Sequence, residues 1–278
     1  MGALISVIWS LLIKPRNCVR RNLQNNPLPE VCHLCIEERH IAGQQVCVVG
    51  DVHGCIDELS ELIAEAEKKA GHGKVVFVFV GDLVNRGPSS VGVVRKLRAM
   101  SSRVYAVRGN HDESAIREAR KFREDNNYIL SEKYFWVKYI ENEDFAFLNS
   151  LPYTISLPSL NALVVHAGLI PGVDLENQIL NDMTNMRNIV HQDDPFFPVP
   201  VLKGTNSHGQ GDPWVSLWPG PQHVYFGHDA RRGMQRARYA TGLDTGCCHG
   251  GALTGVFISG PCSGEFITIP SKQPRAHA

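Results

Sequence analysis

The chain contains 278 residues, of which 43% are hydrophobic and 20% are charged, so it can bury a core and differs from a disordered segment. Lysine and arginine together number 28, and aspartate and glutamate also number 28, so the chain has no formal net charge that would attract a polyanion over its whole surface. This balance argues against a general nucleic-acid coat protein. A chain of this length forms one large domain or two small ones.

The first 21 residues have the pattern of a membrane anchor. Residues 3–13 are almost wholly apolar, but eleven helical residues rise only about 16 Å, less than the bilayer core of about 30 Å. The basic residues follow this run, which reverses the charge order of a cleavable secretory signal. The start, MGALIS, fits the myristoylation pattern at Gly2, and Cys18 among arginines offers a second acylation site. We predict an acylated anchor, with a signal anchor or a helix packed on the domain as alternatives.

The eight cysteines are spread along the chain, which is typical of reduced thiols. We therefore predict an intracellular location, at the cytoplasmic face of a membrane if the N-terminus is acylated and otherwise in the cytoplasm. Cys32 and Cys35 form a CxxC, but no second CxxC or HxxxH stands at zinc-finger distance. Of the adjacent Cys247 and Cys248, we expect one to face the core and the other to face solvent.

The body of the chain is predicted to be a layered α/β domain. Residues 22–44 have the composition of a linker and residues 270–278 that of a loose tail. Between them, short β-branched runs alternate with helical patterns. We predict helices at 59–66 and 89–100 and a charged helical surface layer at 116–139. The predicted strands lie at 46–49, 74–80, 104–107, 163–165, 224–226, 253–258 and 266–269.

Five of these strands end in short polar turns: GDVHG at 50–54, GD at 81–82, GNHD at 109–112, HAG at 166–168 and GHD at 227–229. One such turn alone would be a helix cap or a turn residue. Ligands of open α/β sheets bind beyond the carboxyl ends of the strands, so we expect the five turns to meet at one edge. Their oxygen and nitrogen donors are Asp51, His53, Asp82, Asn110, His166 and His228.

Six donors suit two ions, and a central carboxylate can bridge them, as in the two-metal clamp of phosphoester hydrolysis. The mixture of nitrogen and oxygen donors suits manganese, iron or zinc better than calcium. The sequence therefore predicts a centre of two divalent ions, with manganese as the first choice and zinc, iron or magnesium as alternatives.

The turns resemble the motifs of the calcineurin-like metallophosphoesterase superfamily, in its phosphoprotein-phosphatase branch, with GDVHG at 50–54, GDLVNRGP at 81–88, RGNHD at 108–112 and HAG at 166–168. The later stretches are most similar to bacterial diadenosine tetraphosphatases and their ApaH-like relatives. These stretches are PW at 213–214, PGP at 219–221, FGH at 226–228, LDTGCC at 243–248 and GGALT at 250–254. The resemblance covers residues 45–269 and implies a four-layer α/β/β/α sandwich with a dimetal centre at the carboxyl ends of the strands.

The resemblance also implies a role for each site residue. It assigns one ion to Asp51, His53 and Asp82, and the other ion to Asp82, Asn110, His166 and His228. It places the proton donor on His111 and the phosphate-binding arginine on Arg86. Arg187 is predicted to be a second phosphate clamp, with a solvated charge at a helix end as the alternative.

Asn85 departs from the related protein serine/threonine phosphatases, which carry an aspartate there that steadies the protonated catalytic histidine. An amide supplies no opposite charge, so His111 would be a weaker acid. Cleavage of a phosphoanhydride depends less on a general acid, because its leaving group is a phosphate or nucleotide rather than an alkoxide. The ApaH-like relatives also carry a neutral residue at this position.

The predicted function is hydrolysis of phosphoanhydride bonds by in-line attack of metal-bound hydroxide. The expected partner is a dinucleoside polyphosphate, a polyphosphate or the capped 5′ end of a nucleic acid, and no obligate protein partner is expected. A serine/threonine protein phosphatase is the alternative, and a membrane-tethered binding module with little turnover is an alternative of another class. A local basic patch would grip a polyanion. Its predicted members are Arg86, Arg187, Arg231, Arg232, Arg236 and Arg238.

Overall fold

The computed structural model describes residues 21–22, 24–193 and 201–274. The predicted anchor, with Gly2 and Cys18, lies outside the described residues except for Arg21. No helix in the described part of the chain is long and apolar enough to cross a membrane.

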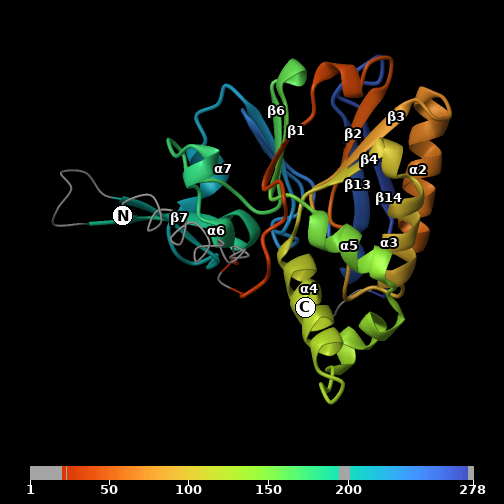
Figure 1. Ribbon diagram of the computed structural model, residues 1–278. Coiled ribbons are helices and arrows are strands. Elements are labelled where there is room, and N and C mark those ends of the chain that lie inside the picture. Colours follow the sequence, from red (N-terminus) through yellow and green to blue (C-terminus); the bar gives the residue numbers. More distant parts are fainter. Residues whose placement is uncertain (1–20, 23, 194–200, 275–278) are drawn as a thin grey trace, which may run out of the picture.

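Two sheets packed face to face form the centre of the fold (Figure 1). The five-stranded sheet has the spatial order β14 (Phe266–Pro270), β13 (Ala252–Phe257), β2 (Gln45–Val49), β3 (Val75–Phe79) and β4 (Val104–Ala106). The six-stranded sheet has the order β1 (His33–Cys35), β5 (Thr154–Leu157), β6 (Ala162–Val165), β10 (His223–Phe226), β12 (Ala240–Gly242) and β11 (Gln235–Ala237).

Strand β2 is buried on both faces because its side chains alternate between two cores. Val46 and Val48 lie in the core between the two sheets, whereas Cys47 and Val49 lie in the core beneath the helices. Strand β3 pairs with β2 in parallel and alternates in the same way. This double burial explains why both strands are nearly continuous apolar runs in the sequence.

Helices cover the outer face of the five-stranded sheet (Figure 1). Helix α2 (Ile56–Ala70) packs on β13, β14 and β3, and α3 (Ser90–Ala99) packs on α2 and on α5 (Asn142–Ser150). Helix α4 (Asn110–Glu124) packs on α5 and on the 3-10 helix η3 (Glu132–Tyr139). The other 3-10 helices are η1 (Glu38–His40), η2 (Ser101–Arg103), η4 (Pro158–Leu160), η5 (Leu175–Asn177) and η6 (Cys247–His249).

The outer face of the six-stranded sheet is covered by α6 (Leu180–Asn185), α7 (Trp214–Leu217) and a three-stranded sheet of order β8 (Val201–Thr205), β7 (Asn188–Gln192) and β9 (Asp212–Pro213). Met183, Ile189 and Trp214 from this layer share one core with residues of β6 and β10. The predicted four-layer α/β/β/α sandwich is confirmed, with a fourth layer that mixes two short helices and a small sheet.

Two of the predicted segments differ from the structure. The predicted linker, residues 22–44, contains β1, which pairs in parallel with β5, and its Asn22 side chain donates to the Tyr153 hydroxyl at 3.1 Å. A three-residue strand is too short to show a period of two, so the pattern did not reveal it. In the predicted tail, residues 270–278, the main-chain amide of Ser271 donates to the carbonyl of Gly251. The main-chain amide of Lys272 donates to the carboxylate of Glu58. Residues 275–278 of that tail lie outside the described residues.

The predicted helical layer at 116–139 consists of the end of α4, a turn and the 3-10 helix η3. It is only partly a surface layer, because Ile116 and Ala119 are fully buried. Strands β5, β7, β8, β9, β11 and β12 were not predicted, and of these β8, β9 and β12 contain Gly or Pro, which weaken a strand pattern.

Candidate metal centre

The five polar turns meet at the carboxyl edge of the strands, as expected from the parallel order of β2, β3 and β4 and of β6 and β10. They surround a cavity of about 110 Å³. The predicted residues that line it are His53, Asp82, Arg86, Asn110, His111, Arg187 and His228. His166 is fully buried next to the cavity, where its Nε2 lies 3.1 Å from Asn110 Oδ1.

Several residues of these turns adopt a left-handed backbone, which non-glycine residues rarely do. The φ angles are 48° at His53, 48° at Asp82 and 69° at His228, and the neighbouring Asn85 and Arg86 have 70° and 69°. Each such conformation costs about 1–3 kcal/mol and persists where the surrounding structure imposes it, most often at functional sites. The strain therefore concentrates in the turns that carry the candidate ligands.

Two glycines in the turns allow the carboxylates to approach the backbone. A Cβ atom on Gly227 would collide with Oδ1 of Asp51, and one on Gly109 would collide with Oδ1 of Asp82. The sequences GHD and GNHD thus need glycine for close packing against a carboxylate, although neither glycine has a positive φ.

Three histidines are oriented in the manner of metal ligands. Each places one ring nitrogen against a main-chain carbonyl: His53 Nδ1 on Val84 at 3.2 Å, His166 Nδ1 on Val80 at 2.9 Å and His228 Nε2 on Asn185 at 2.9 Å. A carbonyl oxygen only accepts, so that nitrogen carries the proton and the other one is left with a lone pair. Metal-bound histidines are held in this way by their second nitrogen.

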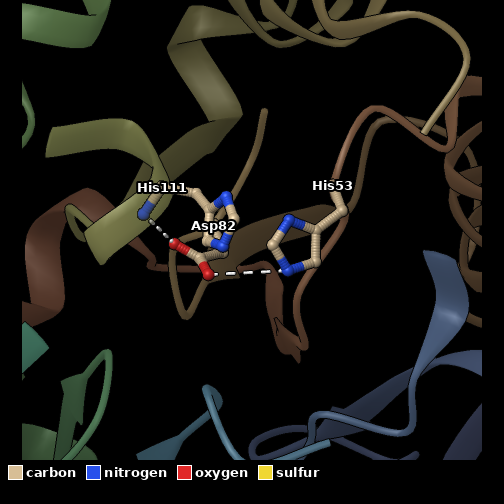
Figure 2. A group of neighbouring side chains, drawn as sticks. All are labelled: His53, Asp82 and His111. Atoms are coloured by element: carbon tan, nitrogen blue, oxygen red, sulfur yellow. Dashed lines mark hydrogen bonds and ion pairs between the residues drawn. The ribbon is translucent and has the colours of Figure 1, made fainter. Parts of the chain in front are cut away.

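The lone pairs converge with oxygen atoms in the centre of the site. Nε2 of His53 and Nε2 of His166 both lie 3.5 Å from Asp82 Oδ2. Figure 2 shows the Asp82 carboxylate in contact with the His53 ring and with the main-chain nitrogen of His111. Asn110 Oδ1 lies 3.1 Å from His166 Nε2 and 3.0 Å from His228 Nδ1. Acceptors that face one another without a proton between them need a cation, so these residues fit a bound metal ion.

The pKa values of these groups fit a cation-binding site. Burial lowers the pKa of His166 to about 3 and holds the pKa values of His53 and His228 well below the usual range, so the imidazoles are neutral. Burial raises the pKa of Asp82 to about 8. A divalent ion would compensate the carboxylate charge and keep Asp82 ionised.

The structure brings two overlapping groups of ligand atoms together, and each group lies within 4.8 Å. One contains Asp82, His166 and His228, and the other contains His53, Asp82 and His111. Asp82 belongs to both, as a bridging ligand would. Asp51 lies outside both groups: its carboxylate accepts the main-chain amide of His228 at 3.1 and 3.2 Å. Its pKa is raised by burial and then by the charges of Asp244 and Asp82.

Asp112 and Asp244, which are not among the predicted site residues, complete the acidic surroundings. The Asp112 carboxylate accepts the amides of Leu83 at 3.0 Å and Gly109 at 2.9 Å, and so joins two of the turns. Asp244 lines the cavity, and burial raises its pKa to about 6. Asp244 also follows a strand directly, but that strand is the three-residue β12, which the pattern did not predict.

His111 and Arg86 lie on the open side of the cavity. Arg86 donates from Nη2 to His111 Nε2 at 3.1 Å and from Nη1 to His249 Nε2 at 2.5 Å. An arginine only donates, so Nε2 of His111 accepts and its Nδ1 carries the proton. Burial and then the charge of Arg86 lower the pKa of His111 to about 3, so its imidazole is neutral.

The basic patch predicted from the sequence is divided in the structure. Arg86, Arg187 and Arg231 line the cavity. Arg187 is half-buried and donates to the His228 carbonyl at 3.1 Å, so the alternative of a solvated charge at a helix end was wrong. The other three arginines lie elsewhere: Arg232 pairs with Asp229, Arg236 stacks on Phe266 and Arg238 stacks on Tyr239.

Comparisons with known proteins agree with this site. The family model described as calcineurin-like phosphoesterase matches residues 45–239. The chain belongs to this family. Its members use a dimetal centre, and the residues described above are candidate ligands for one. The chain is therefore a metallophosphoesterase, as its motifs predicted.

Relatives with related names match most of the chain. A protein of Halalkalibacterium halodurans named bis(5′-nucleosyl)-tetraphosphatase PrpE [asymmetrical] is 29% identical and aligns over 83% of this chain and 95% of its own length. A symmetrical bis(5′-nucleosyl)-tetraphosphatase of Coxiella burnetii is 27% identical over 80% of this chain and 90% of its own. A crystal structure described as a putative diadenosine tetraphosphatase is 33% identical, with a TM-score of 0.72 over 87% of this chain and 98% of that one.

Proposed function

We propose that this metallophosphoesterase hydrolyses phosphoanhydride bonds, with dinucleoside polyphosphates as its substrate class. The names of the relatives support this class. The observation that carries the proposal is Asn85, whose Nδ2 donates to the main-chain carbonyl of His111 at 3.0 Å and leaves the imidazole without an acidic partner. A neutral His111 suits a phosphate leaving group better than an alkoxide.

The proposed ligand sets follow the turns. Asp51, His53 and Asp82 would hold one ion, and Asp82, Asn110, His166 and His228 would hold the other. When bound, the two ions supply a nucleophile derived from water and offset the charge of the phosphoryl group. We propose manganese as the resident ion, with zinc, iron or magnesium as alternatives, because nitrogen and oxygen donors are mixed.

Arg86 and Arg187 are proposed to position the substrate phosphates. Arg86 is exposed and its planar fork faces the cavity between His111 and His249, so a phosphate can take over both of its donors. Arg187 is fixed by His228 and Asp229 and also lines the cavity. The exposed Arg231, which also lines the cavity, is placed to contact a further phosphate of a polyphosphate chain.

His111 is proposed to contact the leaving group. Its Nε2 faces the cavity, and its Nδ1 proton has no carboxylate acceptor among the described residues near it, since Asn85 offers only its amide nitrogen at 3.5 Å. Its imidazole therefore remains neutral at neutral pH and acts as a hydrogen-bonding group rather than a strong acid. This chemistry favours anhydrides over phosphoserine.

The rival functions make different demands on the same cavity. A serine/threonine phosphatase requires protonation of an alkoxide, for which the pair of Asn85 and His111 is poorly suited. A polyphosphate or a capped RNA end would need a longer basic track, and only three of the six predicted patch arginines line the cavity. A binding module with little turnover has no need for the strained turns at His53, Asp82 and His228.

The test is a side-by-side rate measurement. The metal-free protein, resupplied in turn with manganese, zinc or magnesium, is assayed on diadenosine tetraphosphate, capped RNA, polyphosphate and a phosphoserine peptide. We expect the dinucleotide to be cleaved fastest, and nucleotide analysis of the products shows whether cleavage is symmetrical. A faster rate on the phosphopeptide would refute the substrate assignment. The absence of metal-dependent turnover on every anhydride would refute the proposed phosphoanhydride hydrolase activity.

We propose in addition that the apolar and basic segment at residues 1–21 holds the enzyme at the cytoplasmic face of a membrane. Support comes from the sequence alone, where Gly2 and Cys18 offer two acylation sites and Cys18 is flanked by basic residues. For a chain that starts at Met1, replacing Gly2 with Ala should move the protein from the membrane fraction to the supernatant. An unchanged distribution would contradict myristoylation.

A further inference from the structure

A second group of metal-ligating type lies behind the turn that carries His53. Cys55, Glu58 and Cys247 each offer one ligand atom, and the three atoms lie within 4.8 Å of one another. The residues are completely enclosed, with exposed fractions of 0%, 0% and 2%. None of them belongs to the ligand sets proposed for the cavity, so the dimetal centre does not account for this group.

The group joins two elements that are distant in the sequence, α2 and η6. Cys55 immediately precedes α2, Glu58 lies in the first turn of that helix, and Cys247 begins η6. The partner of Cys247 is therefore Cys55 and not its neighbour Cys248, which is only partly buried, as expected for one cysteine facing inward and one outward. Helix η6 also ends at His249, which accepts from Arg86.

The hydrogen bonding of Glu58 indicates that this group binds a cation. Its Oε1 accepts the amide of Lys272 at 2.7 Å and the side chain of Gln273 at 3.2 Å. Its Oε2 is buried and has no hydrogen-bond partner among the described residues. The Lys272 ammonium does not fill this place, because it pairs with Glu61 at 2.6 Å. A buried carboxylate oxygen without a donor is costly, and a bound cation removes that cost.

Two thiols determine which cation fits. Thiolate ligands select zinc and other soft ions over magnesium or calcium. Zinc accepts sulfur and carboxylate oxygen together, usually with four ligands in a closed structural site. Both thiols lose their protons to solvent when the ion binds.

We propose that Cys55, Glu58 and Cys247 form a structural zinc site, separate from the dimetal centre, with a water as the fourth ligand. The site ties η6 to the start of α2. It thereby fixes His249, and with it Arg86, at the mouth of the catalytic cavity. This inference does not depend on which anhydride the enzyme cleaves.

The experiment uses cobalt as a probe, because a cobalt–thiolate bond gives an intense charge-transfer band in the near ultraviolet and nitrogen or oxygen ligands do not. The metal-free full chain is titrated with Co²⁺ under reducing conditions. We expect the full band to correspond to one thiolate-bound Co²⁺ per chain and to be displaced by an excess of Zn²⁺. Replacing Cys55 or Cys247 with Ser should abolish the band, and Glu58→Gln should weaken metal binding by at least about 10-fold, as loss of metal-site partners does.

Two controls separate this site from other thiols. Cys262→Ser changes a buried cysteine outside the group, and Cys32→Ser with Cys35→Ser removes the CxxC; both variants should keep the band. If the band is lost only in the CxxC variant, or is absent from the wild-type chain, the proposal is wrong. A wild-type mass lower by two hydrogens, mapped to a Cys55–Cys247 disulfide, would also overturn it.

The wild-type protein decides the matter if the serine variants fail to fold. X-ray absorption at the zinc edge of the purified full chain, with manganese supplied to the dimetal centre, should show a sulfur shell at about 2.3 Å. A zinc spectrum with only nitrogen and oxygen neighbours would contradict the site. Neither readout measures phosphatase activity, so failure here and failure of the proposed function are distinguishable.

Discussion

The side chain of Asn85 donates from Nδ2 to the His111 main-chain carbonyl at 3.0 Å, and the same nitrogen lies beside the His111 imidazole. Its orientation is fixed from the other side, because the indole of Trp136 can only donate and does so to Asn85 Oδ1 at 3.0 Å. The Nδ1 proton of His111 therefore faces an amide nitrogen at 3.5 Å, which cannot accept it.

Replacing Asn85 with Asp should change the leaving groups that the enzyme accepts. A carboxylate can accept the Nδ1 proton and raise the pKa of His111, which burial and Arg86 now hold at about 3. A protonated His111 would serve poor leaving groups. We expect the ratio of kcat/KM for a phosphoserine peptide to that for diadenosine tetraphosphate to rise by about 10-fold or more, within the range of general acid catalysis.

Asn85→Ala is the matched control, because it removes the amide without adding a charge. Its substrate ratio should stay near that of the wild type. A ratio that rises equally in both variants would show that lost packing against Trp136, and not the new charge, alters the specificity.

Asp82 is the residue on which both groups of ligand atoms depend. Asp82→Asn leaves the size of the side chain unchanged but removes the charge that would bridge two ions. We expect the rate to fall by more than about 100-fold, because even the partners of metal ligands cost 10- to 100-fold. Metal analysis should show the loss of at least one ion, whereas Asp57→Asn, an exposed change in α2, should alter neither quantity. Full activity with two ions retained would refute the two-metal assignment.

The turn residues were predictable because the chemistry is local in the sequence. Asp51, His53, Asp82, Asn110 and His228 each follow a strand whose apolar run is easily seen, and parallel strands bring their ends together. The two central sheets follow from the alternation in β2 and β3. The pattern did not reveal β12, whose sequence ATG is short and lacks an apolar run, and so missed the role of Asp244.

Other features require contacts between distant segments and have no signature in a pattern. The orientation of Asn85 depends on Trp136, which is 51 positions away in the chain. The meeting of Cys55 with Cys247 depends on how η6 packs against α2. The sequence suggested only that Cys247 and Cys248 face different surroundings, because their nearest partners are set by tertiary structure.

Arg86 should contribute to substrate binding through both of its terminal nitrogens. Its guanidinium now spans His111 and His249. Arg86→Ala should lower kcat/KM by about 100-fold, close to the loss of one transition-state donor. Arg86→Lys should recover only part of the lost kcat/KM, because an ammonium cannot make two parallel hydrogen bonds to a phosphate. Arg238→Ala, an exposed arginine stacked on Tyr239, is the control and should be active. Equal rates for Arg86→Ala and the wild type would remove Arg86 from the site.

A buried carboxylate far from the cavity should determine part of the acid sensitivity of the fold. Asp144 in α5 is 0% exposed and is bound by Arg98 and by Arg95, at 3.3 Å, from α3. Burial alone would raise the pKa of Asp144, but the Glu141 amide and the two guanidinium groups outweigh it and hold the pKa below its usual range. The carboxylate therefore stabilises the fold at pH values above its unfolded pKa of about 4.

This contribution is lost as the pH falls through the lower, folded pKa. Asp144→Asn should reduce the free energy of unfolding at pH 7 by about 1–3 kcal/mol, because the hydrogen bonds to Arg95 and Arg98 lose their charged acceptor. The difference between variant and wild type should shrink toward pH 3. Urea unfolding at both pH values measures it, and the exposed Glu143→Gln serves as the control. A difference that does not depend on pH would mean that packing, and not the charge of Asp144, holds α3 against α5.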